Sequence, residues 1–83
     1  KESHEEGMVR LSLSTGKKHG IRPSDVVGAI AGHANIPGST IGKIFIQDQH
    51  TFVDVEAQYV SMVLGKTGSY RVRNYENVTV ERA

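Results

Sequence analysis

The chain first alternates apolar with polar residues and then changes to a helical spacing. Every second residue from Val9 to Ser14 is apolar, which predicts a strand that buries one face. Val26, Val27, Ile30 and Ala34 follow at the spacing of residues on one side of a helix. We therefore expect an amphipathic helix to follow the first strand.

Local signals set the limits of this helix. Pro23 suits the first helical position, where its missing N–H costs nothing, and Asp25 complements the positive end of the helix dipole. The segment 35–38, Asn-Ile-Pro-Gly, is typical of a helix end. Gly28 and Gly32 each weaken a helix by about 1 kcal/mol relative to alanine. Their four-residue spacing would let a neighbouring backbone approach closely.

The rest of the chain predicts a hairpin, a short helix and a closing strand. Residues 41–47 and 51–55 are apolar segments joined by a short polar connection, which indicates an antiparallel hairpin. Residues 57–64 have helical spacing, residues 70–75 fit either an edge strand or a turn, and residues 78–81 fit a last strand. The order β-α-β-β-α-β predicts an α+β sandwich, a four-stranded antiparallel sheet with two helices on one face.

The composition sets further limits. With 83 residues and no cysteine, the chain fits one domain without disulfides or thiolate metal sites. Residues 1–7 hold one lysine and three glutamates, and we expect them to be a disordered linker stub before a folded domain at 8–83. That domain carries nine basic and six acidic side chains, and its net charge of +3 favours a polyanionic partner. The apolar runs are far shorter than the roughly 18 residues that span a bilayer, so we expect a cytoplasmic protein without a membrane partner.

The candidate chemistry lies on the sheet face that the helices leave open. Phe45, Phe52 and Asp54 point outward in this topology, beside the cations Arg10 and Lys43. Such a surface suits single-stranded RNA, because bases stack on rings and phosphates pair with cations. His50 precedes Phe52 by two residues, the spacing of two stacking side chains on one strand. The alternative is that Phe45 and Phe52 form a cross-strand pair that stabilises the hairpin, or that they pack under the C-terminal segment.

A second cationic feature is the loop from Gly16 to Gly20, whose glycines would let the backbone approach a phosphate closely. The alternative is an ordinary solvated loop. Further arginines follow near the C-terminus. The residues predicted to bind RNA are Arg10, Lys17, Lys18, His19, Arg22, Lys43, Phe45, His50, Phe52, Arg71, Arg73 and Arg82.

Other motifs carry less weight. The four histidines lack metal-ligand spacing, and Gly65-Lys66-Thr67 lacks the earlier glycine of a P-loop. The turn from Gly65 to Gly68 matches the clamp loop of KH domains, but no second helix is expected after it. No catalytic dyad or triad is evident. We therefore expect no catalytic residue, metal or cofactor in this segment.

Three blocks of sequence, in the same order, resemble a known family. Residues 11–30, which include the run Thr-Gly-Lys-Lys-His-Gly-Ile-Arg-Pro-Ser-Asp-Val-Val-Gly-Ala-Ile, are similar to the signature of the DbpA-type RNA-binding domain. Residues 41–44 with 50–55 resemble its second block, and the basic strand 78–82 its third. That domain is the C-terminal appendage of bacterial DEAD-box RNA helicases of the DbpA and DeaD groups. The likeness covers about residues 8–82 and implies an RRM-like fold.

The resemblance implies a domain that docks structured, often ribosomal, RNA and delivers the helicase core of the same chain to it. This segment would not be an enzyme, whereas the parent chain would be an ATP-dependent RNA helicase that binds ATP and Mg in its core. Ribosome biogenesis and cold shock are the implied settings.

Ser12 stands where many relatives carry an aromatic residue. This favours the less selective DeaD-like kind without deciding the subgroup, and suggests that loops and phosphates contribute more than stacking. The alternative function is protein interaction or self-association, including dimerisation, through Phe45, Phe52 and Tyr59.

Overall fold

The computed structural model describes residues 7–83, so residues 1–6 of the expected linker lie outside the described part of the chain. The elements follow the predicted order, with short 3-10 turns at several junctions and an additional hairpin near the C-terminus. In chain order they are β1 (Met8–Leu13), η1 (Lys17–His19), α1 (Pro23–Ala34), η2 (Gly38–Thr40), β2 (Ile41–Ile46), β3 (Thr51–Glu56), η3 (Ala57–Tyr59), α2 (Val60–Leu64), β4 (Tyr70–Val72), β5 (Tyr75–Val78) and β6 (Val80–Arg82).

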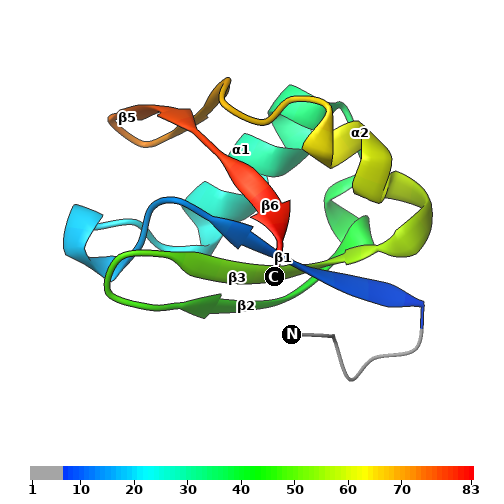
Figure 1. Ribbon diagram of the computed structural model, residues 1–83, viewed down its shortest axis with the longest axis horizontal. Helices are drawn as coiled ribbons and strands as arrows, with labels where there is room; N and C mark the ends of the chain where they lie inside the picture. The colour runs from blue at the N-terminus through cyan, green and yellow to red at the C-terminus, as the bar shows by residue number, and fades with distance from the viewer. Residues whose placement is uncertain (1–6) are drawn as a thin grey trace.

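Four strands form the main sheet in the order β2-β3-β1-β6, and every neighbouring pair is antiparallel. The helices α1 and α2 pack on one side of this sheet (Figure 1). The strands β4 and β5 form a separate two-stranded sheet. This arrangement confirms the RRM-like α+β sandwich that the β-α-β-β-α-β pattern predicted.

The alternation in β1 and β3 decides which residues enter the core. Leu11, Leu13, Val53 and Val55 are essentially fully buried against the helices. Burying an aliphatic side chain stabilises a protein by about 1.5–3 kcal/mol, so strands of this pattern gain most by turning their apolar side to the helices. From the helices, the core takes Val26, Ala29, Ile30, Ala34, Val60 and Val63.

The helix α1 begins and ends where the sequence predicted. Pro23 is its first residue, and Asn35, with a φ of 58°, turns the chain out of the helix. The Oδ2 atom of Asp25 accepts the backbone N–H of Arg22 at 2.8 Å. Because this N–H favours the charged carboxylate, it is the main reason why the pKa of Asp25 lies below its ordinary value.

Two expectations about α1 are wrong. Val27 is only half-buried, whereas Ala29, which the periodic pattern passed over, is buried. Gly28 and Gly32 are exposed, and a Cβ atom at either position would meet nothing within 4 Å. Within residues 7–83, no neighbouring backbone uses these glycines for a close approach.

The segment expected as one closing strand, 78–81, is divided between two sheets. β5 ends at Val78 and pairs with β4, whereas β6 starts at Val80 and pairs with β1. Asn77, whose φ is 58°, lies in a bulge of β5 just before this division. Residues 70–75, which fitted either a strand or a turn, form β4 and the turn into β5.

A bulge in β2 keeps its apolar side under the helices. Ile41 and Ile44 lie opposite two inward residues of β3, so β2 has Gly42 and Lys43 where β3 has a single residue. In a regular strand, residues three apart point to opposite faces. Both isoleucines nevertheless pack against the core, and Lys43 is exposed.

We expect Tyr70 on β4 to make the stability of the domain depend on alkaline pH. Its ring is fully buried, and its hydroxyl donates to the carbonyl oxygen of Val63 at 2.7 Å. Burial disfavours the tyrosinate and raises the pKa of Tyr70 to about 12. Below pH 10 the favourable effect of the neutral phenol is fully present. We expect it to be lost as the pH rises from about 10 to about 12, because over this range only the unfolded chain releases the proton.

Urea unfolding of the wild type and of Tyr70→Phe, repeated at several alkaline pH values, tests this expectation. The variant removes the hydroxyl that donates to the carbonyl oxygen of Val63, although this oxygen keeps the backbone N–H of Lys66 at 3.2 Å. The variant should therefore be about 1 kcal/mol less stable near neutral pH. It should then lose less stability than the wild type as the pH rises. Equal alkaline losses in both proteins would contradict the assignment to Tyr70.

Candidate nucleic-acid interface

The strand register places four side chains in one row across the open face of the sheet. Phe45 of β2 lies opposite Phe52 of β3, Phe52 opposite Ser12 of β1, and Ser12 opposite Glu81 of β6. Phe45 is 41% exposed, and Phe52 is half-buried. The aromatic side chains lie on the outward side, as predicted, and are also directly paired across the strands. The two interpretations of the sequence are therefore compatible.

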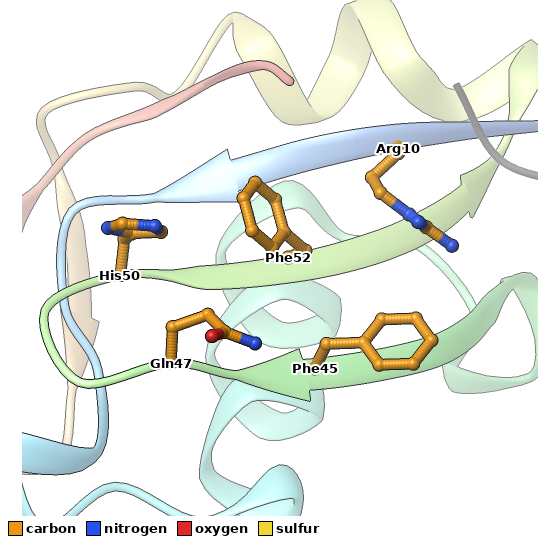
Figure 2. A pocket seen from close by; sticks show the side chains of 5 residues that line it. All are labelled: Arg10, Phe45, Gln47, His50 and Phe52. Atoms are coloured by element: carbon orange, nitrogen blue, oxygen red, sulfur yellow. The ribbon is translucent and has the colours of Figure 1, made fainter. Parts of the chain in front are cut away.

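Arg10 and Asp54 form the neighbouring row. Nε of Arg10 donates to Oδ1 of Asp54 at 2.8 Å, and Nη2 donates to Oδ2 at 3.2 Å. The guanidinium carbon also lies 4.8 Å from the centre of the Phe45 ring, and Figure 2 shows the side chain reaching from β1 toward that ring. Asp54 was expected to be accessible on the open face, but it is fully buried. Arg10 therefore holds Asp54 and the Phe45 ring, and its contact with RNA stays a prediction.

Two hollows on the open face share the side chains of His50 and Phe52, and Figure 2 shows the residues that line the first of them. These two rings have their centres 5.3 Å apart and meet edge to face. They form a ridge, which we call the His50–Phe52 ridge, where the sequence predicted two stacking residues. One hollow, of about 360 Å³, is completed by Arg10, Phe45 and Gln47. The other, of about 230 Å³, is completed by Ser12, Leu13, Ser14, Thr79 and Glu81.

A third hollow, of about 450 Å³, leads from the sheet face to the basic loop. Its lining includes Lys17 together with Gln47 and His50, which also line the first hollow. Backbone hydrogen bonds hold the loop at this place. The N–H of Lys17 donates to the carbonyl oxygen of Gln47 at 2.7 Å, and the N–H of Lys18 donates to the backbone carbonyl oxygen of Asp48 at 2.8 Å. The basic loop therefore continues the open face of the sheet.

Gly16 has a different role from the expected one. A Cβ atom there would lie 2.6 Å from the backbone nitrogen of His50 and closer still to the carbonyl oxygen of Gln47. Gly16 thus lets the loop pack tightly against the β2–β3 turn, and the close approach is to the protein's own backbone. Gly20, with a φ of 73°, closes the η1 turn.

His19 links this loop to the C-terminal hairpin. Its Nδ1 atom accepts the backbone N–H of Gly16 at 3.2 Å and lies 2.9 Å from Oγ1 of Thr15. Its ring centre is 4.4 Å from that of Tyr75 on β5, with the planes tilted by 55°. Because Nδ1 accepts a backbone N–H, the neutral ring carries its proton on Nε2, which can donate to a phosphate.

The remaining predicted cations fall into two groups. Arg22 and Arg73 both approach Oδ2 of Asp25, at 3.5 and 3.8 Å, and Nη1 of Arg73 also donates to the carbonyl oxygen of Gly20 at 3.0 Å. These two arginines tie the hairpin, the basic loop and the start of α1 together. The other group is exposed and forms no ion pair within residues 7–83: Lys17, Lys18, Lys43, Arg71 and Arg82.

Sequence reasoning missed Tyr75, which is 41% exposed. Its neighbours two positions away, Arg73 and Asn77, are both polar. A core strand would carry apolar residues at that period, so this pattern was the signal that the ring faces outward. Tyr59, in contrast, is half-buried and packs against the core.

The part of the chain that the structure describes contains no cluster of three or more potential metal ligands. None of its helices is both long enough and apolar enough to cross a membrane.

An antiparallel sheet with two helices behind it, aromatic rings on its other face and a cationic loop at its end defines an RRM-like RNA-binding domain. The sequence model of the family described as "DbpA RNA binding domain" matches residues 10–82. The chain belongs to this family, which confirms the resemblance seen in the sequence.

A curated relative supports the same assignment. The chain is 42% identical over 48 residues to the "ATP-dependent RNA helicase DbpA" of Escherichia coli (strain K12). The matched region is 58% of this chain and 10% of that helicase. The match thus covers about a tenth of the length of the relative.

Proposed function

We propose that this domain tethers the core of an ATP-dependent DEAD-box RNA helicase to structured RNA, and that the RNA is ribosomal. The observation that carries the proposal is the His50–Phe52 ridge, which stands between two hollows and continues to a loop of exposed lysines in a member of an RNA-binding family. The helicase core would lie in the same chain outside these residues and would bind ATP and Mg there. Action in the cytoplasm during ribosome biogenesis or cold shock is part of this proposal.

The geometry supports separate contacts for the bases and for the phosphates of the RNA. Unpaired bases would stack on the ridge, and each base stacked on an aromatic ring contributes about 1–3 kcal/mol. Phosphates would pair with the exposed cations around it: Lys17 and Lys18 at the basic loop, Lys43 on β2 and Arg82 on β6. Ser12, Ser14 and Thr79, in the second hollow, offer hydroxyl groups to base edges or to the 2′-hydroxyl of the sugar.

Titration of the domain with a labelled RNA stem–loop at several salt concentrations tests the proposal. We expect the logarithm of the affinity to fall linearly with the logarithm of the salt concentration, with a slope of roughly 0.7–0.9 per phosphate contact. The double variant Lys17→Ala, Lys18→Ala should bind all RNAs more weakly and with a slope smaller by about 1.5. Phe52→Ala should weaken binding chiefly where unpaired bases are offered.

Lys66→Ala is the matched control, because Lys66 is exposed on the loop after α2. It should leave both affinity and slope unchanged. Failure of the wild type to bind any RNA at low salt would overturn the proposal. Equal affinity for ribosomal fragments and for unrelated RNAs of the same shape would overturn its ribosomal part alone. Dimerisation at RNA-binding concentrations, seen by light scattering with a protected sheet face, would favour the alternative of self-association.

A further inference from the structure

The second aromatic surface of the domain lies at the C-terminal hairpin, where Tyr75 is 41% exposed. Its ring packs against that of His19, with the centres 4.4 Å apart. The hairpin is fastened to the same loop by Arg73, whose Nη1 donates to the carbonyl oxygen of Gly20 at 3.0 Å. Tyr75 is therefore held on a defined support with much of its ring accessible.

This ring lies at the end of a continuous surface that starts on the sheet. The hollow beyond the His50–Phe52 ridge is lined by His50, Gln47 and Lys17. Lys17 begins the η1 turn, and His19, which ends it, contacts Tyr75. In Figure 1 the β2–β3 turn, η1 and the tip of the β4–β5 hairpin lie at the same end of the molecule. A chain that leaves the ridge can therefore cross the β2–β3 turn and reach Tyr75 without leaving the protein surface.

The charges along this route suit a nucleic acid backbone. Lys17 and Lys18 are exposed where the route crosses the loop, and Arg71 is exposed on the hairpin that carries Tyr75. Proteins that bind single-stranded nucleic acids place aromatic rings and cations alternately along the bound strand. The rings stack on the bases and the cations pair with the phosphates. Asp48 is the one acidic residue that lines the third hollow.

We propose that Tyr75 is a second stacking residue, on which an RNA strand places a base after it has crossed from the ridge past Lys17. This inference rests on the proposed function and extends its site from the sheet to the hairpin. The ridge and Tyr75 then bind successive parts of one strand, so affinity depends on strand length in two stages. Only a strand long enough to span the loop gains the second contact.

Fluorescein-labelled oligouridylates of increasing length, from about 3 to about 12 nucleotides, test this inference in solution. For the wild type we expect a first affinity from the ridge and a further gain once the strand reaches the hairpin. Tyr75→Leu keeps an apolar side chain against His19 but removes the aromatic face. It should lose about 10-fold in affinity for the long oligomers and nothing for the short ones, which corresponds to about 1.4 kcal/mol. Tyr75→Phe should behave like the wild type.

The comparison with Phe52→Ala separates this inference from the proposed function. Phe52→Ala should weaken short and long oligomers alike, because the ridge is used by both. Unchanged affinity of Tyr75→Leu for long oligomers would overturn the role of Tyr75 while the proposed function stands. Equal losses for short and long oligomers would also overturn it, since Tyr75 would then act only by fastening the hairpin. If the wild type bound the stem–loop RNA but no oligomer at low salt, the role of Tyr75 would fail while the proposed function stands.

Discussion

Arg10→Ala is expected to lower the free energy of unfolding by about 3 kcal/mol. This is the largest effect that we expect from a substitution on the open face of the sheet. The carboxylate of Asp54 has no solvent exposure, and the Arg10 guanidinium holds it by two parallel hydrogen bonds of 2.8 and 3.2 Å. Removing the guanidinium takes two charge-assisted hydrogen bonds away from a carboxylate that has no access to water. The Phe45 ring also loses the cation that lies 4.8 Å from its centre.

Urea unfolding monitored by circular dichroism measures this loss, and two variants define its cause. Arg82→Ala removes an exposed arginine from β6 and should change the stability by less than about 0.5 kcal/mol. The double variant Arg10→Leu, Asp54→Leu removes both charges and should recover most of the loss, because an apolar pair needs no counterion. A loss below about 1 kcal/mol in Arg10→Ala would show that other groups hold Asp54 in the fold.

This prediction affects how RNA binding by Arg10 variants is to be interpreted. A weaker complex would follow from a displaced Phe45 ring as much as from a lost phosphate contact. Arg10→Lys retains the positive charge but not the bidentate geometry or the flat cation over the ring. If it binds RNA as weakly as Arg10→Ala does, the role of Arg10 is to position Phe45.

The arrangement of Arg10 and Asp54 marks the limit of what the sequence could predict. Period-two alternation correctly placed both residues on the open side of the sheet, since alternation reports only which face a side chain takes. It could not report that the β1–β3 register sets Arg10 opposite Asp54, 44 positions later in the chain. The exposure of a polar residue depends on such a partner, so Asp54 was expected to be accessible and is buried.

The helix α1 and the C-terminal hairpin show the same difference between features that depend on neighbouring residues and features that depend on residues far away in the sequence. The limits of α1 were predictable because Pro23, Asp25 and Asn35 act on their own neighbours. The close packing of Gly16 was not predictable, because the residues that crowd it, Gln47 to His50, belong to another turn. Tyr75 was overlooked for the same reason, as its support, His19, lies far away in the sequence.

Gly16→Ala is the second large effect that we expect, and it connects the fold with the RNA site. The backbone of Gly16 is extended, with a φ of −155°, so alanine would not be strained by its own conformation. The obstacle is the β2–β3 turn, whose backbone atoms lie 2.6 and 2.9 Å from the position of the new Cβ. These atoms belong to the peptide chain of residues 47–50 and cannot rotate away as a side chain would.

The loop must therefore move away from the turn, and the hydrogen bonds from the N–H groups of Lys17 and Lys18 must lengthen or break. We expect a loss of about 2–3 kcal/mol in the free energy of unfolding, as overpacking costs about 1–3 kcal/mol and each lost hydrogen bond about 1 kcal/mol. The lysines would also be displaced from the ridge. RNA affinity should therefore fall at temperatures where the variant is still fully folded, with a smaller salt slope.

Gly28→Ala is the matched control, because the same methyl group is added where nothing lies within 4 Å. In the exposed middle of α1 it should stabilise the domain by about 0.5–1 kcal/mol and leave RNA binding unchanged. Thermal unfolding and RNA titration of the two variants side by side measure both quantities. Should Gly16→Ala match the wild type in stability and salt slope, the basic loop would not be anchored on the β2–β3 turn. The lysines would then reach RNA without the support of the sheet.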